Sequence, residues 1–389
     1  MASKVALVRC TSYDYPKVLE AVRHGVDLLG GPSALFKPGE KLLLKPNFLA
    51  GDPPEAGTTT HYTVFRAMGE VLKADNHPLS YGDSPAFQSP KSVAEKCGVA
   101  KQADELGIPL SDFVTPVEVK FPEGRQNKVF TLAKGAVEDG RIVSLSKMKV
   151  HAFQRITGAI KNQFGCIPGI LKGEYHVKLP NAYEFAKMLV DLNMLLKPAL
   201  FLMDGVLAME GNGPRGGVLT PMNVLLFSTD PVALDATVCR MLNHDPSMVP
   251  TVQFGGESGL GNWKDADIEI VGESLSTFVK PGFDIPRSPL RAVAPGGIMR
   301  AISNLLVPRP VIDPKICIKC GICVNMCPVN PKAVDWHDGN KKNPPTYKYD
   351  RCIRCYCCQE TCPEHAISLR KPLIRRIFGG RRAKKAVKA

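Results

Sequence analysis

Several familiar sequence features are missing from this chain of 389 residues. No apolar run reaches the length of about 18 residues that marks a membrane-spanning helix, so we expect none. The N-terminus enters a strand-like segment directly, so we also expect no secretory signal. The nucleotide-binding loop G-x-x-x-x-G-K-S/T is absent, and no G-x-G-x-x-G run opens a helix after a strand. The C-x3-C-x2-C spacing of radical SAM enzymes does not occur either. These absences argue against membrane-spanning, nucleotide-binding and radical SAM proteins.

The chain is instead rich in cysteine, with thirteen residues. Eight of them form two copies of the pattern C-x2-C-x2-C-x3-C-P: Cys317, Cys320, Cys323 and Cys327 before Pro328, then Cys352, Cys355, Cys358 and Cys362 before Pro363. This is the bacterial spacing for [4Fe–4S] ligation, in which the fourth cysteine of each run ligates the other cluster. The pattern therefore predicts two [4Fe–4S] clusters, one on Cys317, Cys320, Cys323 and Cys362 and the other on Cys352, Cys355, Cys358 and Cys327.

Zinc and disulfides are the alternatives for so many cysteines. Zinc sites usually combine two C-x-x-C pairs, or cysteine with histidine, without a third thiol at the same spacing or a proline after the last one. Disulfides suit an oxidising compartment, whereas eight cluster ligands leave only scattered cysteines and favour a reducing cytoplasm. The adjacent Cys357 leaves open which thiol of the pair binds in the second motif. Cys358 has the expected spacing, so we assign it as the ligand and Cys357 as a packing residue.

Length and composition predict several domains. A chain of this length with 44% apolar residues can bury a large core and is expected to form about two to three domains. We expect an α/β domain over residues 1–280, a proline-rich surface linker over 281–314, a cluster-binding domain over 311–370 and a basic tail over 371–389. The tail holds eight lysine and arginine residues, in a chain whose net charge is +13. It suits peripheral binding to an anionic membrane, an acidic partner, or simple solubility; nucleic acid is disfavoured because no DNA-binding motif accompanies it.

The first 280 residues alternate short apolar runs with helical patterns, which predicts an α/β fold with a mostly parallel sheet. Strands are expected near residues 5–8, 41–44, 79–82, 141–145, 200–203, 224–227 and 268–271. Helices are expected near residues 15–29, 63–74, 92–106, 182–196 and 231–242. The glycine-rich stretch 211–217 contains a proline and precedes a strand, so we expect a loop there that brings backbone close to another group.

Polar residues follow the predicted strands, at the ends where ligands bind in open α/β sheets. The candidates for ligand binding are Lys45, Asn47, Asp83, Asn162, Glu210, Gly211 and Gly213. The candidates for catalysis are His151, His176, Lys147, Lys149, Lys161 and Asp204. The lysines indicate a pocket for a carboxylate, phosphate or other anion, although a solvated lysine face and ordinary aspartate turns are the alternatives. We favour the pocket because Lys45 and Lys147 directly follow apolar strands. His151 or His176 is the candidate proton donor, although a lone histidine is more often structural.

Two family resemblances extend this interpretation. The segment 311–370 resembles the two-cluster bacterial ferredoxins, which implies a small α+β ferredoxin-like domain. The larger region resembles the prokaryotic family known as domain of unknown function 362, which often carries a C-terminal ferredoxin. The residues that carry this resemblance are 45–47 (Lys-Pro-Asn), 59–61 (Thr-Thr-His), 82–85 (Gly-Asp-Ser-Pro), 147–151 (Lys-Met-Lys-Val-His), 158–162 (Gly-Ala-Ile-Lys-Asn), 165–169 (Gly-Cys-Ile-Pro-Gly), 203–205 (Met-Asp-Gly), 210–214 (Glu-Gly-Asn-Gly-Pro) and 228–236 (Ser-Thr-Asp-Pro-Val-Ala-Leu-Asp-Ala). The resemblance implies an iron–sulfur protein with a redox role and does not imply a substrate.

Three functions are compatible with these features. The first is a ferredoxin-fused oxidoreductase, in which two clusters pass electrons from a soluble donor or redox partner protein to an anionic small molecule at the α/β domain. Fusion favours it, because a tethered carrier has a high effective concentration at its partner. The second is a non-catalytic carrier subunit of a larger redox complex. The third is a maturation or scaffold protein that uses its clusters structurally.

Overall fold

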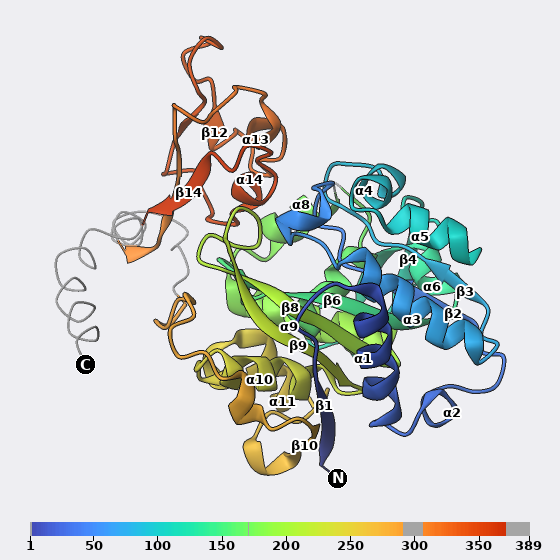
Figure 1. Ribbon diagram of the computed structural model, residues 1–389. Helices are drawn as coiled ribbons and strands as arrows, with labels where there is room; N and C mark the ends of the chain where they lie inside the picture. The colour runs from blue at the N-terminus through green and yellow to red at the C-terminus, as the bar shows by residue number, and fades with distance from the viewer. Residues whose placement is uncertain (1, 170, 291–305, 371–389) are drawn as a thin grey trace. The chain divides into compact units, whose positions relative to one another are not determined.

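The computed structural model describes residues 2–169, 171–290 and 306–370, and the contacts divide the chain into two compact units. The first unit contains Met1–Lys172 and Ala186–Ser288, and the second contains Gly173–Phe185 and the chain from Pro289 onward. Figure 1 shows the secondary-structure elements of both.

The first unit is built on one mixed sheet. Its strand order is β10 (Ile268–Gly272), β1 (Ser3–Arg9), β9 (Val218–Ser228), β8 (Leu200–Glu210), β6 (Arg141–His151), β2 (Leu42–Lys45) and β3 (Leu79–Tyr81). The pairs β10–β1, β8–β6, β6–β2 and β2–β3 are parallel, whereas β9 is antiparallel to both β1 and β8. A short strand, β7 (Arg155–Ile156), pairs with the end of β6. The predicted α/β class with a mostly parallel sheet is confirmed.

Helices follow most of these strands. They are α1 (Tyr15–Asp27), α2 (Pro32–Leu35), α3 (Tyr62–Ala74), α4 (Pro90–Lys96), α5 (Val99–Leu106), α6 (Lys134–Glu138), α7 (Ala159–Asn162), α8 (Leu171–Lys178), α9 (Ala182–Leu196), α10 (Pro231–Met241) and α11 (Pro250–Glu257). The helix predicted over 92–106 is two helices, because Gly98 between them has φ 80°. No helix of the described residues combines the length and apolarity needed to span a bilayer.

Both faces of the sheet are covered. Leu42 and Leu44 of β2 pack into the cluster that contains Met68 of α3, while Leu43 between them packs with Leu196 at the end of α9. Successive side chains of a strand point to opposite faces, so this split requires packing on each side. The hairpin of β4 (Pro116–Lys120) and β5 (Val129–Ala133) was not expected from the sequence.

Two strands run further than their apolar sequences indicate. β6 continues past residue 145 and β8 past residue 203, so Lys147 and Lys149 lie inside β6 and Asp204 lies inside β8. The expectation that these residues follow the strands is therefore wrong. The strands continue because Lys147 and Asp204 face each other across the parallel ladder and neutralise one another.

The cysteine-rich part of the second unit is small and mixed in secondary structure. β11 (Arg309–Ile312) pairs with β14 (Ile367–Arg370), and β12 (Val334–Asp335) pairs with β13 (Thr346–Tyr347), in both cases antiparallel. One short helix lies in each cysteine motif, α13 (Ile322–Asn325) and α14 (Cys357–Glu360). The predicted small α+β domain is confirmed.

The linker predicted over 281–314 is shorter in the structure. Phe283 and Ile285 are buried in the first unit. Arg309–Ile312 form a strand because their backbone pairs with residues 367–370. Residues 291–305 of the predicted linker and the predicted basic tail 371–389 lie outside the described residues.

A buried carboxylate fixes the start of α7, the short helix that carries Lys161 and Asn162. Asp235 of α10 accepts hydrogen bonds from the backbone N–H groups of Ala159 (2.6 Å) and Ile160 (3.1 Å). Gly158 before them has φ 44°, and a methyl group there would overlap the Asp235 carboxylate. Glycine is therefore required at this turn. Burial raises the pKa of Asp235 to about 7, although the two N–H groups act in the opposite direction.

We predict that Asp235→Ala lowers the free energy of unfolding by about 1–3 kcal/mol, because it leaves buried N–H groups of α7 without an acceptor. Asp235→Asn should cost less, since its amide oxygen still accepts one hydrogen bond. Between about pH 4 and pH 7, the folded wild type keeps the proton on Asp235, whereas the unfolded chain releases it. The contribution of Asp235 to the free energy of unfolding should therefore decrease as the pH rises through this range. Urea unfolding of the wild type and both variants across that range measures these effects; an alanine variant as stable as the wild type would contradict them.

Candidate functional site

Tyr13, Lys147 and Asp204 form a hydrogen-bonded network where β1, β6 and β8 approach the carboxyl edge, the edge of the main sheet at which β2 and β3 end. Lys147 Nζ donates to Asp204 Oδ2 (2.8 Å) and to Tyr13 Oη (2.5 Å), and Tyr13 Oη donates to Asp204 Oδ1 (2.8 Å). The backbone N–H of His61, which caps α3, donates to Asp204 Oδ2 at 3.1 Å. The His61 ring stacks on Tyr13, with centroids 3.7 Å apart. The network connects a buried ion pair with two partly exposed rings.

Burial controls protonation in this network. Burial lowers the pKa of the Lys147 ammonium, and the Asp204 carboxylate opposes that shift. Burial, reinforced by Asp204, raises the pKa of the Tyr13 phenol well above its ordinary value. Burial also lowers the pKa of His61 to about 4, so its ring is neutral in neutral solution. Tyr13 and His61 therefore offer neutral hydrogen-bonding groups over the buried charges.

A second buried ion pair joins the ends of β2 and β3. Lys45 Nζ lies 2.8 Å from Asp83 Oδ1, and the two side chains are 0% and 4% exposed. The backbone N–H of Phe48 donates to the other oxygen of Asp83 at 2.6 Å. Gly165 lies directly against the pair, where a methyl group would overlap Asp83 Oδ1. A side chain at position 165 would therefore displace the ion pair.

Lys172 is a further cation beside this pair. Its Nζ donates to the backbone carbonyl of Ser84 at 2.7 Å and to that of Ile167. The residue as a whole is half-buried, but its ammonium lies among these carbonyls. Burial lowers the pKa of Lys172 to about 7; Asp83 opposes the shift, and the positive charges of Lys45 and Lys161 add to it. Lys172 therefore changes charge near neutral pH, which suits anion binding or proton transfer.

The centre of the carboxyl edge is polar. Lys149 Nζ donates to Asn47 Oδ1 and to the carbonyl of Thr58, both at 2.6 Å. Asn162 Nδ2 donates to Ser144 Oγ at 2.9 Å and also reaches the carbonyl of Lys45. These contacts connect β6, β2 and α7 in one hydrogen-bonded arrangement.

Exposure separates the five lysines of the edge into two groups. Lys45, Lys147 and Lys149 are buried, whereas Lys161 and Lys172 are partly exposed. The ammonium groups of Lys161 and Lys172 lie 5.8 and 6.0 Å from the ring centroid of Phe164, so both lie near the same ring. A solute that reaches this edge therefore meets the second group of lysines.

The glycine-rich loop between β8 and β9 is held by several contacts. Glu210 accepts hydrogen bonds from Thr220 Oγ1 (2.5 Å) and the backbone N–H of Asp284 (2.6 Å). Gly211 has φ 74°, and a methyl group at Gly213 would overlap the carbonyl of Val150. Two nitrogens of Arg215 donate to the two carboxylate oxygens of Asp52 in a buried pair. The loop thus approaches the backbone of β6 closely, in accord with its glycine content.

The two candidate histidines have different environments. His151 is fully buried, and its Nδ1 accepts the backbone N–H groups of Phe153 (3.0 Å) and Gln154 (3.2 Å). It therefore closes the turn between β6 and β7. His176 belongs to the second unit, where its ring stacks on Phe185 with centroids 4.5 Å apart. These contacts favour structural roles for both.

The structure gathers part of the predicted set at the carboxyl edge: Lys45, Asn47, Asp83, Lys147, Lys149, Lys161, Asn162 and Asp204. Glu210, Gly211 and Gly213 form the adjoining loop. From the sequence, Tyr13 has no predicted role, His61 belongs only to the residues that carry the family resemblance, and Lys172 belongs to the polar stretch after Lys161 that indicates a cation-rich pocket. Tyr13 follows β1. The expectation that ligands bind beyond the carboxyl ends of the strands would have identified Tyr13 if it had been applied to β1 as well. Lys172 follows no strand, and its proximity to Asp83 comes from the fold alone.

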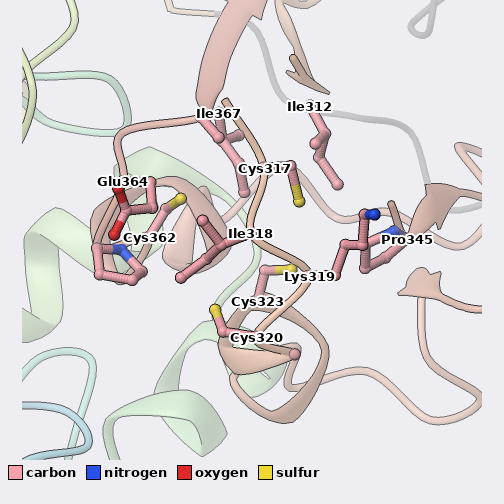
Figure 2. Close-up of a pocket in the computed structure, with 13 residues that line it drawn as sticks. Ile312, Cys317, Ile318, Lys319, Cys320, Cys323, Pro345, Cys362, Glu364 and Ile367 are labelled. Atoms are coloured by element: carbon pink, nitrogen blue, oxygen red, sulfur yellow. The ribbon is translucent and has the colours of Figure 1, made fainter. Parts of the chain in front are cut away.

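The eight motif cysteines line two cavities in the second unit. Cys317, Cys320, Cys323 and Cys362 line one, together with Ile312, Ile318 and Ile367 (Figure 2). Cys327, Cys352, Cys355 and Cys358 line the other, and Tyr347 is in its wall. Each cavity therefore takes three cysteines from one motif and the fourth from the other. Soft thiolate donors in an apolar cradle fit an iron–sulfur cluster.

The remaining cysteines are not part of these cavities. Cys357 is absent from the walls of both. All thirteen cysteines lie in the described residues, and none forms a disulfide. Burial raises the pKa of Cys166, beside Lys45 and Asp83, to about 12, so its thiol stays protonated.

Comparisons with known proteins agree with this division. The 4Fe-4S dicluster domain family matches residues 316–366, and the Domain of unknown function (DUF362) family matches residues 42–240, just over half of the chain. The Thylakoid-associated protein sll1697 of Synechocystis sp. is 34% identical over 267 residues, which cover 67% of this chain and 81% of that protein. Pyruvate synthase subunit PorD of Methanocaldococcus jannaschii is 37% identical over 60 residues, 15% of this chain and 64% of that subunit.

A solved structure gives a more distant likeness. The lactate racemase apoprotein from Thermoanaerobacterium thermosaccharolyticum aligns with a TM-score of 0.38 and 10% identity, over 61% of this chain and 56% of that chain.

The fold, the cysteine cavities and the family matches define an iron–sulfur protein with a [4Fe–4S] domain and an electron-transfer role. The chain belongs to the DUF362 family, and its C-terminal part is a 4Fe-4S dicluster domain. Both predicted resemblances are confirmed.

We predict that Lys147→Met lowers the free energy of unfolding by about 3–5 kcal/mol, because it leaves the Asp204 carboxylate buried without its cation. The double variant Lys147→Met/Asp204→Leu should lose less than the sum of its single variants. The exposed pair Lys178–Glu174 (3.2 Å) is the matched control, and breaking it should cost less than about 1 kcal/mol. Urea unfolding of both double-mutant cycles measures the coupling; additive losses at Lys147 and Asp204 would contradict the prediction.

Proposed function

We propose that this protein is a ferredoxin-fused oxidoreductase that transfers electrons through two [4Fe–4S] clusters to an anionic small molecule at the carboxyl edge. One cluster is held by Cys317, Cys320, Cys323 and Cys362, and the other by Cys327, Cys352, Cys355 and Cys358. The division of these thiols between two cavities supports this ligand assignment. When bound, the clusters supply one-electron redox chemistry.

The observation that carries the substrate class is the charge around Lys172. Burial, with the positive charges of Lys45 and Lys161, lowers the pKa of Lys172, and Asp83 is the carboxylate that opposes this shift. An anion that binds there stabilises the charged form of Lys172, which burial otherwise disfavours. A carboxylate or phosphate group satisfies this requirement.

The lysines of the edge take different roles in this proposal. Lys161 and Lys172 are partly exposed and contact the substrate. Lys45, Lys147 and Lys149 are buried and hold strands, loops and carboxylates in position. Tyr13 and His61 lie over the Lys147–Asp204 pair, and Tyr13 is the neutral O–H donor nearest that buried charge. The candidate histidines His151 and His176 are secondary to these groups.

The second candidate is an electron-carrier subunit of a larger redox complex. The relative PorD is a subunit of pyruvate synthase, which favours this alternative. The name of the Synechocystis relative associates that protein with thylakoids, so peripheral membrane binding through the basic tail 371–389 belongs to the same proposal. A reducing compartment such as the cytoplasm suits thirteen cysteines without a disulfide.

We predict that Cys355→Ala lowers the iron content from about eight to about four atoms per chain, because one cluster loses a ligand. Cys357→Ala should keep about eight, since Cys357 lies outside both cavities. Iron and acid-labile sulfide are measured on protein purified without oxygen. Loss of one cluster from Cys357→Ala, with Cys355→Ala unaffected, would show that the assignment is wrong.

We predict that the anaerobically reduced protein is reoxidised by a member of a panel of carboxylate and phosphate metabolites. The rate should be higher at about pH 6 than at about pH 8, because Lys172 is charged below its lowered pKa and loses that charge as the pH rises through it. Lys172→Met should slow the reaction at least about tenfold, or about 1.4 kcal/mol. Cluster absorbance records the rate.

Lys178→Met is the matched control for this experiment, because Lys178 is on the same helix but is exposed and paired with Glu174. It should react like the wild type. If no member of the panel oxidises the clusters, and the protein is purified from its natural source in a stable heteromeric complex, the carrier alternative replaces the oxidoreductase.

A further inference from the structure

The two cysteine motifs are structural repeats whose equivalent positions can be compared. Cys317 corresponds to Cys352, so each residue of the first motif corresponds to the one 35 positions later (352 minus 317). Lys319 and Arg354 are such a pair, and both have φ 62°. Because the backbones agree even at this unusual conformation, differences between side chains at equivalent positions are differences between the two cluster sites.

The first difference is at Ile312 and its equivalent Tyr347. Each lines the cavity of its own motif. Tyr347 Oη donates a hydrogen bond to Cys358 Sγ at 3.3 Å, whereas the hydrocarbon side chain of Ile312 has no donor. The Tyr347 ring is stacked on Tyr349, with centroids 5.6 Å apart and 9° between the planes, which holds the hydroxyl oxygen in place beside Cys358.

The second difference is at Lys319 and Arg354. Lys319 is exposed, whereas Arg354 is only 2% exposed. The Arg354 guanidinium donates to the carbonyl of Cys352 at 3.2 Å and lies 5.1 Å from the Tyr349 ring centroid. A buried positive charge acts more strongly on its surroundings than an exposed one, because water screens the latter.

The third difference is in access to the thiols. Cys320 is exposed, and Cys317 and Cys362 are partly exposed. The four thiols of the other cavity are all buried, with residue exposures of 7–9%. A redox partner therefore approaches the Cys320 side more closely than the Cys358 side.

We infer that Tyr347 and Arg354 give the cluster of Cys327, Cys352, Cys355 and Cys358 the higher reduction potential, so that electrons arrive at the Cys320 side and pass inward to the Cys358 side. This inference rests on the two-cluster assignment proposed above. Reduction adds negative charge, and hydrogen bonds to ligand sulfur and nearby positive charge both stabilise the reduced form. Exposure of Cys320 to solvent acts in the opposite direction, so the inferred order requires the buried charge of Arg354 and the O–H group of Tyr347 to exceed it.

The inferred step is balanced without other reactants. With both clusters bound, the group held by Cys317, Cys320, Cys323 and Cys362 would lose one electron, and the group held by Cys327, Cys352, Cys355 and Cys358 would gain it. No bond forms or breaks, and no proton is required. The side chains of Tyr347 and Arg354 act through the ligands and are positioning residues for this transfer.

The test is a redox titration of the full-length holoprotein, followed by electron paramagnetic resonance, which detects each reduced centre directly and needs no enzyme activity. The wild type should show two transitions. The transition at the higher potential, here called the upper transition, is expected to belong to the cluster of Cys327, Cys352, Cys355 and Cys358. Tyr347→Phe should shift only this transition, toward more negative potential, because it removes the O–H donor and leaves the ring. Tyr349→Phe is the matched control: its hydroxyl donates to the carbonyl of Pro310 at 2.9 Å rather than to sulfur, so both transitions should stay in place.

The reciprocal variant Ile312→Tyr places a hydroxyl at the equivalent position of the first motif. It should raise only the reduction potential of the lower transition, which belongs to the other cluster. A shift of the lower transition in Tyr347→Phe, or no shift of either, would overturn the inferred order. Iron analysis of the same samples separates this from the proposed function. About four iron atoms in the wild type would refute the two-cluster assignment, whereas about eight with an unexpected shift would refute only the order.

Discussion

Buried positive charge is the constraint on which the carboxyl edge of the α/β unit depends. Lys45 and Lys147 are removed from water, and each is stable there because a carboxylate from a neighbouring strand lies 2.8 Å away. Such pairs add little net stability compared with apolar residues, but the loss of either partner is costly. They therefore act mainly by fixing which strand segments lie opposite one another. Gly165 leaves the room that the Asp83 carboxylate requires, as Gly158 does for the separate buried carboxylate of Asp235.

This arrangement separates charges that hold the edge together from charges that are available to a solute. The buried pairs are neutral as units, and Tyr13 and His61 cover one of them with neutral rings. Lys161 and Lys172 remain partly exposed, which is why we propose an anion as the ligand of this edge. In the cysteine-rich domain, a buried arginine, a tyrosine hydroxyl and the exposure of the thiols distinguish the two cavities.

The cysteine motifs and the α/β class were predictable because both are encoded locally, in fixed spacings and in alternating apolar runs. The ends of β6 and β8 were not, because a lysine in an apolar run looks like the end of a strand. The carboxylate that neutralises Lys147 is on β8, more than fifty residues away. The contacts of Lys172 and Asp235 were not predictable for the same reason, since their partners come from distant segments. Pairing between distant residues determines how deeply a charge can be buried, and no local pattern records it.

The most direct test of this account is the titration of the Lys172 ammonium by nuclear magnetic resonance, with lysine carrying an isotope label and Lys172→Arg used to assign the signal. Without ligand, the pKa should be about 7 rather than the ordinary 10.5. Saturating phosphate or a dicarboxylate should raise it, because a bound anion stabilises the charged form. An ordinary pKa without ligand, or a lowered pKa that no anion changes, would contradict the claim that the carboxyl edge is an anion site built around Lys172.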